Sequence, residues 1–227
     1  MMQQWKRSVW AALLTLATLF SFTGCNSAEE ESSESSSVDL SNIASAVMEE
    51  GSTEAVTTDY AYIMNDDGTI SVSAYTGSDT DLTVPGTIDG YVVTAIADHA
   101  FEANPNIKSV TLPNGLITIG ESAFSDCSSL TTIVIPDTVG TIRRGAFISC
   151  TSLTTLEIPA SVTEIMEEAF TGCAALEDLT IASSTVEFAN WWMDTSEIPS
   201  GLTITCPKDS KVAAWADEND VATKPLS

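Results

Sequence analysis

Hydrophobic and polar positions alternate in short blocks through the middle of the chain. One block, "AFSDCSSLTTIVIP" (123–136), places an Ala-Phe pair and a Cys before three spaced aliphatic residues and a proline. This spacing predicts a short strand whose aliphatic side chains point inward and whose intervening side chains point outward. The inward set is Leu130, Ile133 and Ile135, and the outward set is Thr131, Thr132 and Val134. Pro136 is expected to end the strand, because proline has no N–H to donate to a ladder.

The block recurs at a fixed step of 23 residues, beginning at Ala100, Ala123, Ala146 and Ala169. Three columns of large apolar residues keep this step: Phe101, Phe124, Phe147 and Phe170; Ile96, Ile119, Ile142 and Ile165; and Ile107, Leu130, Leu153 and Leu176. A fixed period in this range indicates a solenoid, whose coils bury their apolar faces only by stacking on their neighbours. We therefore predict a parallel strand ladder on one wall, and on the opposite wall a tight turn or short helix that carries the Phe.

A fourth column holds Asn104, Cys127, Cys150 and Cys173. Asn and Cys share a small polar side chain, so we expect this column to be a structural ladder that bonds the backbone of the turn above or below. Coils about 4.8 Å apart would also allow a disulfide, Cys127–Cys150 or Cys150–Cys173. Stacked side chains point the same way, however, and three thiols cannot all pair, so the favoured interpretation is buried, reduced thiols with Cys206 single.

The stretch "LPNGLITIGESAFSDCSSLTTIVIP" (112–136) resembles the unit of the BspA-like leucine-rich repeats of bacterial surface proteins. The resemblance extends over residues 60–222 and implies an α/β solenoid of 23-residue coils with a parallel strand ladder. It also implies a first unit at Gly77–Phe101, and a closing strand and cap helix within Leu202–Val221. At a step of 23, Trp192 and Met193 take the Ala-Phe positions of an altered fifth coil, and Ser196 takes the Cys position.

The stretch "YAYIMNDDGTISVSAY" (60–75) predicts a β-hairpin that turns at Asn65–Gly68. The alternating residues are Tyr60, Tyr62 and Met64 on one strand and Ile70, Val72 and Ala74 on the other. Such a hairpin would cap the open N-terminal edge of the solenoid, so the solenoid with its caps is placed at residues 59–222. Residues 38–58 are predicted to be a short helix or a disordered lead-in, since Leu40, Ile43, Ala44 and Val47 have helical spacing.

The first 24 residues predict a secretory signal, because Lys6 and Arg7 precede an apolar run that is too short for a comfortable membrane span. The sequence "SFTGC" resembles a bacterial lipobox, with Cys25 as the acylated residue; ordinary signal cleavage is the alternative. Residues 25–37, rich in Ser and Glu, predict a flexible acidic tether. Together these features predict a lipid-anchored protein of the bacterial envelope, exposed at the cell surface.

The chain carries 8 basic and 32 acidic residues, for a net charge of −24. Cleavage would remove Lys6 and Arg7, leaving six basic residues against the 32 acidic ones, a balance of −26. This charge disfavours nucleic acid as a partner and disfavours direct contact with anionic membranes, so attachment is assigned to the lipid alone.

The sequence contains few residues that could form a catalytic or metal-binding site. His99 is the only histidine, at a repeat position that varies, and it is interpreted as a surface residue. No Cys pair has the spacing of a zinc site, and the acidic turns at Asn65–Gly68 and Gly77–Asp81 lack the twelve-residue spacing of a calcium loop. We therefore predict no catalytic residue, metal or cofactor, and no enzyme activity.

The remaining candidate is the outward face of the strand ladder, on which solenoids commonly bind; the alternative is that Thr simply suits exposed strand positions. Its residues are Lys108, Ser109, Thr111, Thr131, Thr132, Val134, Thr154, Thr155, Glu157, Glu177, Asp178, Thr180 and Thr203. Trp191 and Trp192 could add an aromatic contact for sugars, although packing in the cap is the preferred interpretation. The resemblance implies non-catalytic adhesion or binding to a protein or glycan; the alternative is an accessory envelope lipoprotein that scaffolds a bacterial partner complex.

Overall fold

The computed structural model describes residues 56–57, 59–192 and 195–226, which belong to one compact unit, Glu49–Ser227. The predicted signal (1–24), Cys25, the tether (25–37) and most of the lead-in (38–58) lie outside these residues. No helix among the described residues is long and apolar enough to span a membrane.

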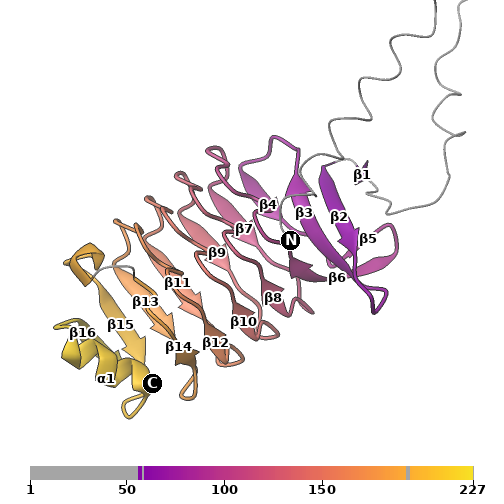
Figure 1. Ribbon diagram of the computed structural model, residues 1–227. Helices are drawn as coiled ribbons and strands as arrows, with labels where there is room; N and C mark the ends of the chain where they lie inside the picture. Colours follow the sequence, from indigo (N-terminus) through magenta and orange to yellow (C-terminus); the bar gives the residue numbers. More distant parts are fainter. Residues whose placement is uncertain (1–55, 58, 193–194, 227) are drawn as a thin grey trace, which may run out of the picture. The chain divides into compact units, whose positions relative to one another are not determined.

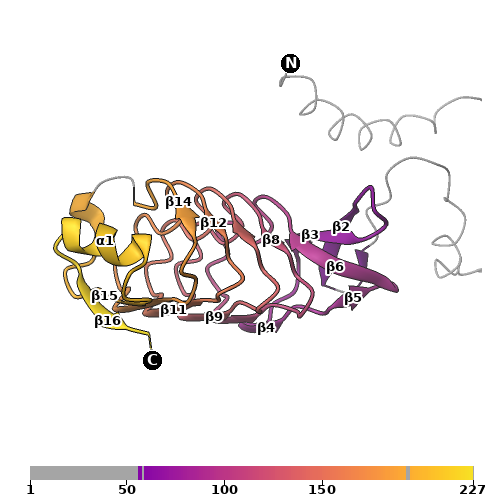
Figure 2. The same cartoon turned by 90° about the horizontal axis from the view of Figure 1, so that it is seen from below.

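The unit is a solenoid, as predicted from the repeat, and it has two walls of parallel strands (Figures 1 and 2). The first wall contains β6 (Tyr91–Ile96), β8 (Thr118–Ile119), β10 (Thr141–Ile142), β12 (Glu164–Ile165) and β14 (Glu187–Phe188). The second contains β4 (Asp81–Thr83), β7 (Ser109–Thr111), β9 (Thr132–Val134), β11 (Thr155–Ile158), β13 (Asp178–Ile181), β15 (Thr203–Cys206) and β16 (Ala222–Pro225). We call this second wall the outer ladder, because it carries the predicted outward face. The first wall was not predicted, since its strands after β6 have only two residues each and leave no alternating pattern.

The core is the stack of apolar columns expected from the sequence. Leu130, Ile133 and Ile135 are buried, whereas the residues between them are exposed. The rings of Phe101, Phe124, Phe147 and Phe170 stack in sequence, with centroids 5.0, 5.7 and 6.2 Å apart. The Ala-Phe segments form turns, so the short helix that we allowed at this position is absent from the described coils.

The N-terminal cap is the predicted hairpin. Strand β2 (Tyr60–Met64) pairs antiparallel with β3 (Ile70–Tyr75), and β3 pairs in parallel with β6, so the hairpin covers the edge of the first wall. The short antiparallel strand β5 (Thr87–Ile88) flanks β6. Strand β1 (Val56–Thr57) pairs with β2, so the cap begins three residues before the predicted boundary at 59, inside the predicted lead-in.

The fifth coil and the C-terminal cap correct two details of the sequence interpretation. The amide of Phe147 donates to the carbonyl of Ala169, and in the next coil the amide of Phe170 donates to the carbonyl of Trp191. Trp191 therefore takes the Ala position and Trp192 the Phe position, one residue earlier than predicted, because the turn after β14 is one residue shorter than in the other coils.

The cap itself consists of β15, the 3-10 helix η3 (Thr195–Glu197), the helix α1 (Lys211–Glu218) and β16. Ser210 caps α1 by accepting a hydrogen bond from the amide of Ala213. Strand β16 pairs in parallel with β15 and extends the solenoid beyond the predicted end at 222. It was not predicted, because all four of its side chains are exposed and leave no apolar pattern.

Candidate binding face of the outer ladder

The predicted face residues project from the outer ladder, and all of them are exposed or half-buried. Strand pairing brings them into rows across the coils, as in Ser109 beside Thr132 and Thr155 beside Asp178. The hydroxyl of Thr131 reaches the carbonyl of Lys108 in the preceding coil at 2.9 Å. Val134 is the most exposed large apolar residue of the described chain, at 55%. The structure thus brings the sequence-predicted face together on one wall.

The outer ladder is interrupted between β9 and β11, which sequence reasoning missed. Strands β4, β7 and β9 form one sheet, and β11, β13, β15 and β16 form another. The first wall is continuous at the same boundary, where Thr118 pairs with Thr141. The core is continuous as well, since the amide of Phe124 donates to the carbonyl of Ala146 at 2.8 Å. The interruption is therefore local to the candidate binding face.

A groove of about 520 Å³ lies at this interruption, and we call it the ladder groove. It is lined by Thr132, Ile133, Val134, Ile135, Asp137, Thr155, Leu156, Glu157, Pro159, Ala160, Asp178, Thr180 and Ala182. The lining mixes hydroxyls, carboxylates and small apolar side chains, and it contains no Lys or Arg. Such a lining can accept hydrogen bonds and attract positive charge.

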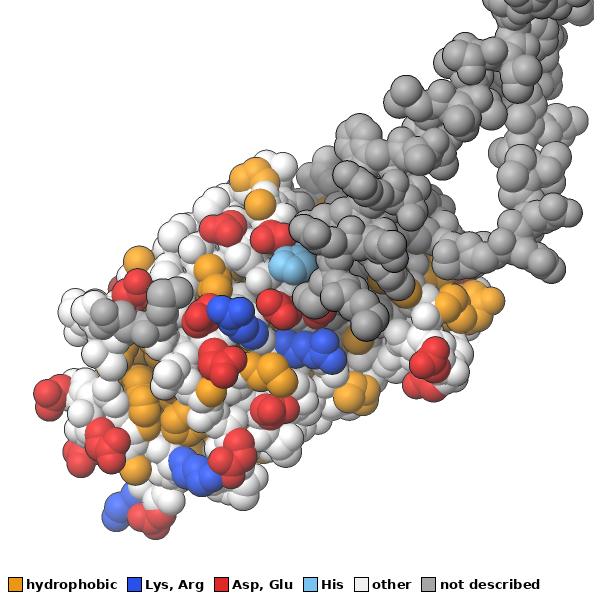
Figure 3. Space-filling view, in the orientation of Figure 1, with side chains coloured by type: hydrophobic (Ala, Val, Ile, Leu, Met, Phe, Trp, Pro, Cys, Tyr) orange, Lys and Arg blue, Asp and Glu red, His pale blue; other side chains and the backbone are white. Residues whose placement is uncertain are grey.

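Acidic side chains dominate the charge of the molecule. Figure 3 shows them spread over the visible face among fewer basic side chains. On the outer ladder, Asp81 accepts hydrogen bonds from the hydroxyls of Ser109 and Thr80, and these bonds hold the pKa of its carboxyl below the usual range. Asp178 lies 3.8 Å from the amine of Lys224, with both side chains more than half exposed, so this pair is well screened by solvent.

The comparisons with known proteins agree with the repeat geometry. The model of the BspA type leucine-rich repeat region matches residues 81–205 in six copies, more than half of the chain. The chain belongs to the BspA-type leucine-rich repeat family. A search of the curated proteins found no match.

Solved leucine-rich repeat proteins have similar structures. The T. pallidum leucine-rich repeat protein is 27% identical, with a TM-score of 0.61, over 67% of this chain and 71% of that one. A leucine-rich repeat protein from Bacteroides capillosus is 29% identical, with a TM-score of 0.51, over 57% of this chain and 97% of that one. A leucine-rich cell surface protein from Faecalibacterium prausnitzii is 28% identical, with a TM-score of 0.51, over 72% of this chain and 47% of that one.

The two adjacent tryptophans of this BspA-type solenoid do not form a contact surface. Trp191 and Trp192 are 1% and 4% exposed, and they pack on Phe170, Phe188 and Trp215 beneath the C-terminal cap. The possible aromatic contact for sugars is therefore wrong, and the alternative of cap packing describes their position. The indoles close the apolar core at the last coil, where no further coil stacks.

The Cys column is a structural ladder in this BspA-type solenoid. The thiols of Cys127, Cys150 and Cys173 donate to the carbonyls of Phe101, Phe124 and Phe147 in the preceding coil, at 3.1 Å each. Asn104 instead accepts from the amides of Asn106 and Ile107 in its own turn. The four described cysteines, which include Cys206, are free and buried, as the favoured interpretation expected.

Burial raises the pKa of the ladder thiols, to about 11 for Cys127 and about 12 for Cys173, from the ordinary value of 9.0. Burial also raises the pKa of Cys150. The Cys column contributes its full stabilisation below pH 9, where its thiols are neutral in both the folded and the unfolded state. Above pH 9 only the unfolded chain loses these protons, so stability is lost as pH rises towards 11–12.

We expect the free energy of unfolding to fall between pH 8 and pH 10.5 by about 1–2 kcal/mol for each ladder thiol. Urea unfolding of the full chain at both values measures this change. The variant with Cys127→Ala, Cys150→Ala and Cys173→Ala is the comparison. It should show a smaller pH dependence, whatever its stability at pH 8, and the remainder is expected from Cys206, Tyr60, Tyr62 and Tyr75, whose pKa values burial also raises. An equal pH dependence in the variant would show that the thiols ionise as readily when folded as when unfolded.

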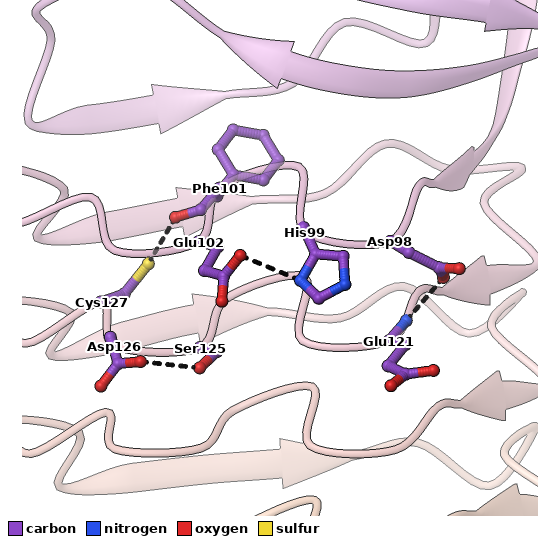
Figure 4. Close-up of polar contacts among 8 residues, drawn as sticks. All are labelled: Asp98, His99, Phe101, Glu102, Glu121, Ser125, Asp126 and Cys127. Atoms are coloured by element: carbon purple, nitrogen blue, oxygen red, sulfur yellow. Dashed lines mark hydrogen bonds and ion pairs between the residues drawn. The ribbon is translucent and has the colours of Figure 1, made fainter. Parts of the chain in front are cut away.

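The turns that carry the Phe column also carry His99, the only histidine of the chain. His99 is confirmed as a surface residue, with its Nδ1 2.9 Å from the carboxylate of Glu102. Figure 4 shows this pair, together with Asp98, which accepts a hydrogen bond from the amide of Glu121, and the thiol of Cys127 directed at the carbonyl of Phe101. Across the described residues, no group of three or more His, Cys, Asp or Glu is placed to hold a metal ion.

Proposed function

We propose that this protein is a non-catalytic binding protein of the bacterial cell surface, whose outer ladder face contacts a protein or glycan ligand. The observation that carries the proposal is the extended, exposed face of hydroxyl and acidic side chains on the outer ladder, from β7 to β15. Extended faces of this kind are the surfaces on which solenoids bind. The BspA-type repeat is a general protein-binding scaffold, which supports the same role.

The surface location has separate support. The family occurs in bacterial surface proteins, and the similar protein from Faecalibacterium prausnitzii is described as a cell surface protein. Cys25 would carry the lipid that anchors the chain, with the acidic tether (25–37) as a spacer. The strong negative charge supports a partner other than nucleic acid, and attachment to the membrane through the lipid alone.

Direct binding of the full chain to matrix proteins, mucins and polysaccharides tests the proposal. We expect saturable binding to one class of ligand, and at least a tenfold loss with Thr132→Arg or Thr155→Arg, because both side chains are exposed at the centre of the face. Thr163→Arg is the control, since Thr163 is also exposed but lies beside β12 on the other wall. Absence of binding across the panel, with one bacterial protein co-purifying in fixed ratio, would instead favour a scaffold for an envelope complex.

A further inference from the structure

The ladder groove lies at a coil boundary of the outer ladder that, within the described residues, lacks a backbone hydrogen bond found at the neighbouring boundaries. At the preceding coil boundary, the amide of Thr131 donates to the carbonyl of Lys108 at 2.9 Å. At the following boundary, the amide of Glu177 donates to the carbonyl of Thr154 at the same distance. No such bond joins β9 to β11 in the part of the chain that the structure describes. The outer ladder is thus less regular at the groove than at the coil boundaries before and after it.

The charge of the ladder groove selects among possible ligands. Three carboxylates line it, those of Asp137, Glu157 and Asp178, and none of the lining residues is basic. Within the described residues, Asp178 has Lys224 beside it at 3.8 Å, whereas Asp137 and Glu157 have no ion pair. A cationic group in the groove would therefore meet two carboxylates that lack a basic partner, and an anionic ligand would be repelled.

The apolar part of the lining adds a second requirement. Val134, 55% exposed, lies at the groove together with Pro159, Ala160 and Ala182. Lysine and arginine combine a long apolar stem with a charged head, so one side chain can cover apolar surface while its charge meets a carboxylate. A metal ion would leave Val134 uncovered, and a neutral sugar would bring no positive charge to the carboxylates.

We propose that the ladder groove binds an extended peptide segment bearing lysine or arginine, with the cationic head at Glu157 and the stem against Val134. This inference rests on the proposed function of the outer ladder, and it names the chemical class of the partner.

The test uses the full chain in mild detergent and a dye-labelled, capped hexapeptide of alternating valine and lysine, followed by fluorescence anisotropy. We expect saturable binding at low salt, and loss of binding when the same peptide carries acetylated lysines, because acetylation removes the charge. Glu157→Gln should weaken binding roughly threefold to fivefold, which corresponds to one partly exposed ion pair. Equal affinity for the acetylated peptide would overturn the inference.

Glu164→Gln is the matched control, since it removes the same charge from an exposed residue on the other wall. It should leave the affinity unchanged; equal losses in the two variants would mean that the net charge of the molecule, and not the groove, attracts the peptide. A surface ligand that depends on Thr132 and Thr155, found together with no affinity for the lysine peptide, would overturn this inference alone. If no matrix protein, mucin or polysaccharide binds but the lysine peptide still does, the proposed surface ligand would be wrong and the peptide site in the groove would stand.

Discussion

Phe147→Ala is expected to lower the free energy of unfolding by about 3–5 kcal/mol. Phe147 is fully buried and lies between two stacked rings, with centroids 5.7 Å from Phe124 and 6.2 Å from Phe170. Truncation would open a cavity in the middle of the column, where coils on both sides are fixed by backbone hydrogen bonds. A domain has only about 5–15 kcal/mol of stability, so this one change would remove a large share.

Urea denaturation of the full chain measures the effect, with Val134→Ala as the control. Val134 is more than half exposed on the outer ladder, so its truncation should change stability by less than about 0.5 kcal/mol. A loss below about 1 kcal/mol for Phe147→Ala would contradict the stacking of the coils around the Phe column.

Gly120→Ala is expected to destabilise the fold by about 1–3 kcal/mol or more, through overpacking. A Cβ atom at this position would lie 2.6 Å from the carbonyl carbon of Ala97 and 2.7 Å from its oxygen. These are backbone atoms of the preceding coil and cannot rotate away. The coils would have to separate where the amide of Gly120 donates to the carbonyl of Ile96.

Gly140→Ala is the comparison for this prediction. The nearest atom to a Cβ at Gly140 is the carbonyl oxygen of Ile117, 4.0 Å away, so alanine fits and stability should stay the same or rise slightly. The thermal midpoints of the two variants, measured side by side, give the answer. Equal midpoints would contradict the close approach of Gly120 to the backbone of Ala97.

The sequence predicted the solenoid because its strongest signals are periodic. Each coil must bury the same apolar face against its neighbours, so Phe124 and Phe147 lie one repeat of 23 residues apart, and the Cys column has the same period. The hairpin was equally clear, since Tyr62 and Val72 alternate with polar residues on either side of a turn. These elements are fixed by local pattern together with stacking on identical neighbours.

Other features were not predictable, each for a physical reason. The Ala-Phe positions of the fifth coil were predicted one residue too late because a turn is one residue shorter there, and two adjacent tryptophans fit either register. Strand β16 pairs with β15 through its backbone and carries only exposed side chains. The interruption between β9 and β11 leaves no mark in the pattern, because Val134 and Glu157 occupy ordinary outward positions. The candidate face was therefore predictable as a row of residues, but its groove was not.

Hydrogen–deuterium exchange of the full chain, with and without the ligand found in the binding panel, tests most directly whether the outer ladder is the binding face. We predict added protection in β7, β9, β11 and β13, with little change in β8, β10 and β12 on the opposite wall. Protection confined to the opposite wall, or to the turns that carry His99 and Glu102, would contradict the assignment of the binding face to the outer ladder.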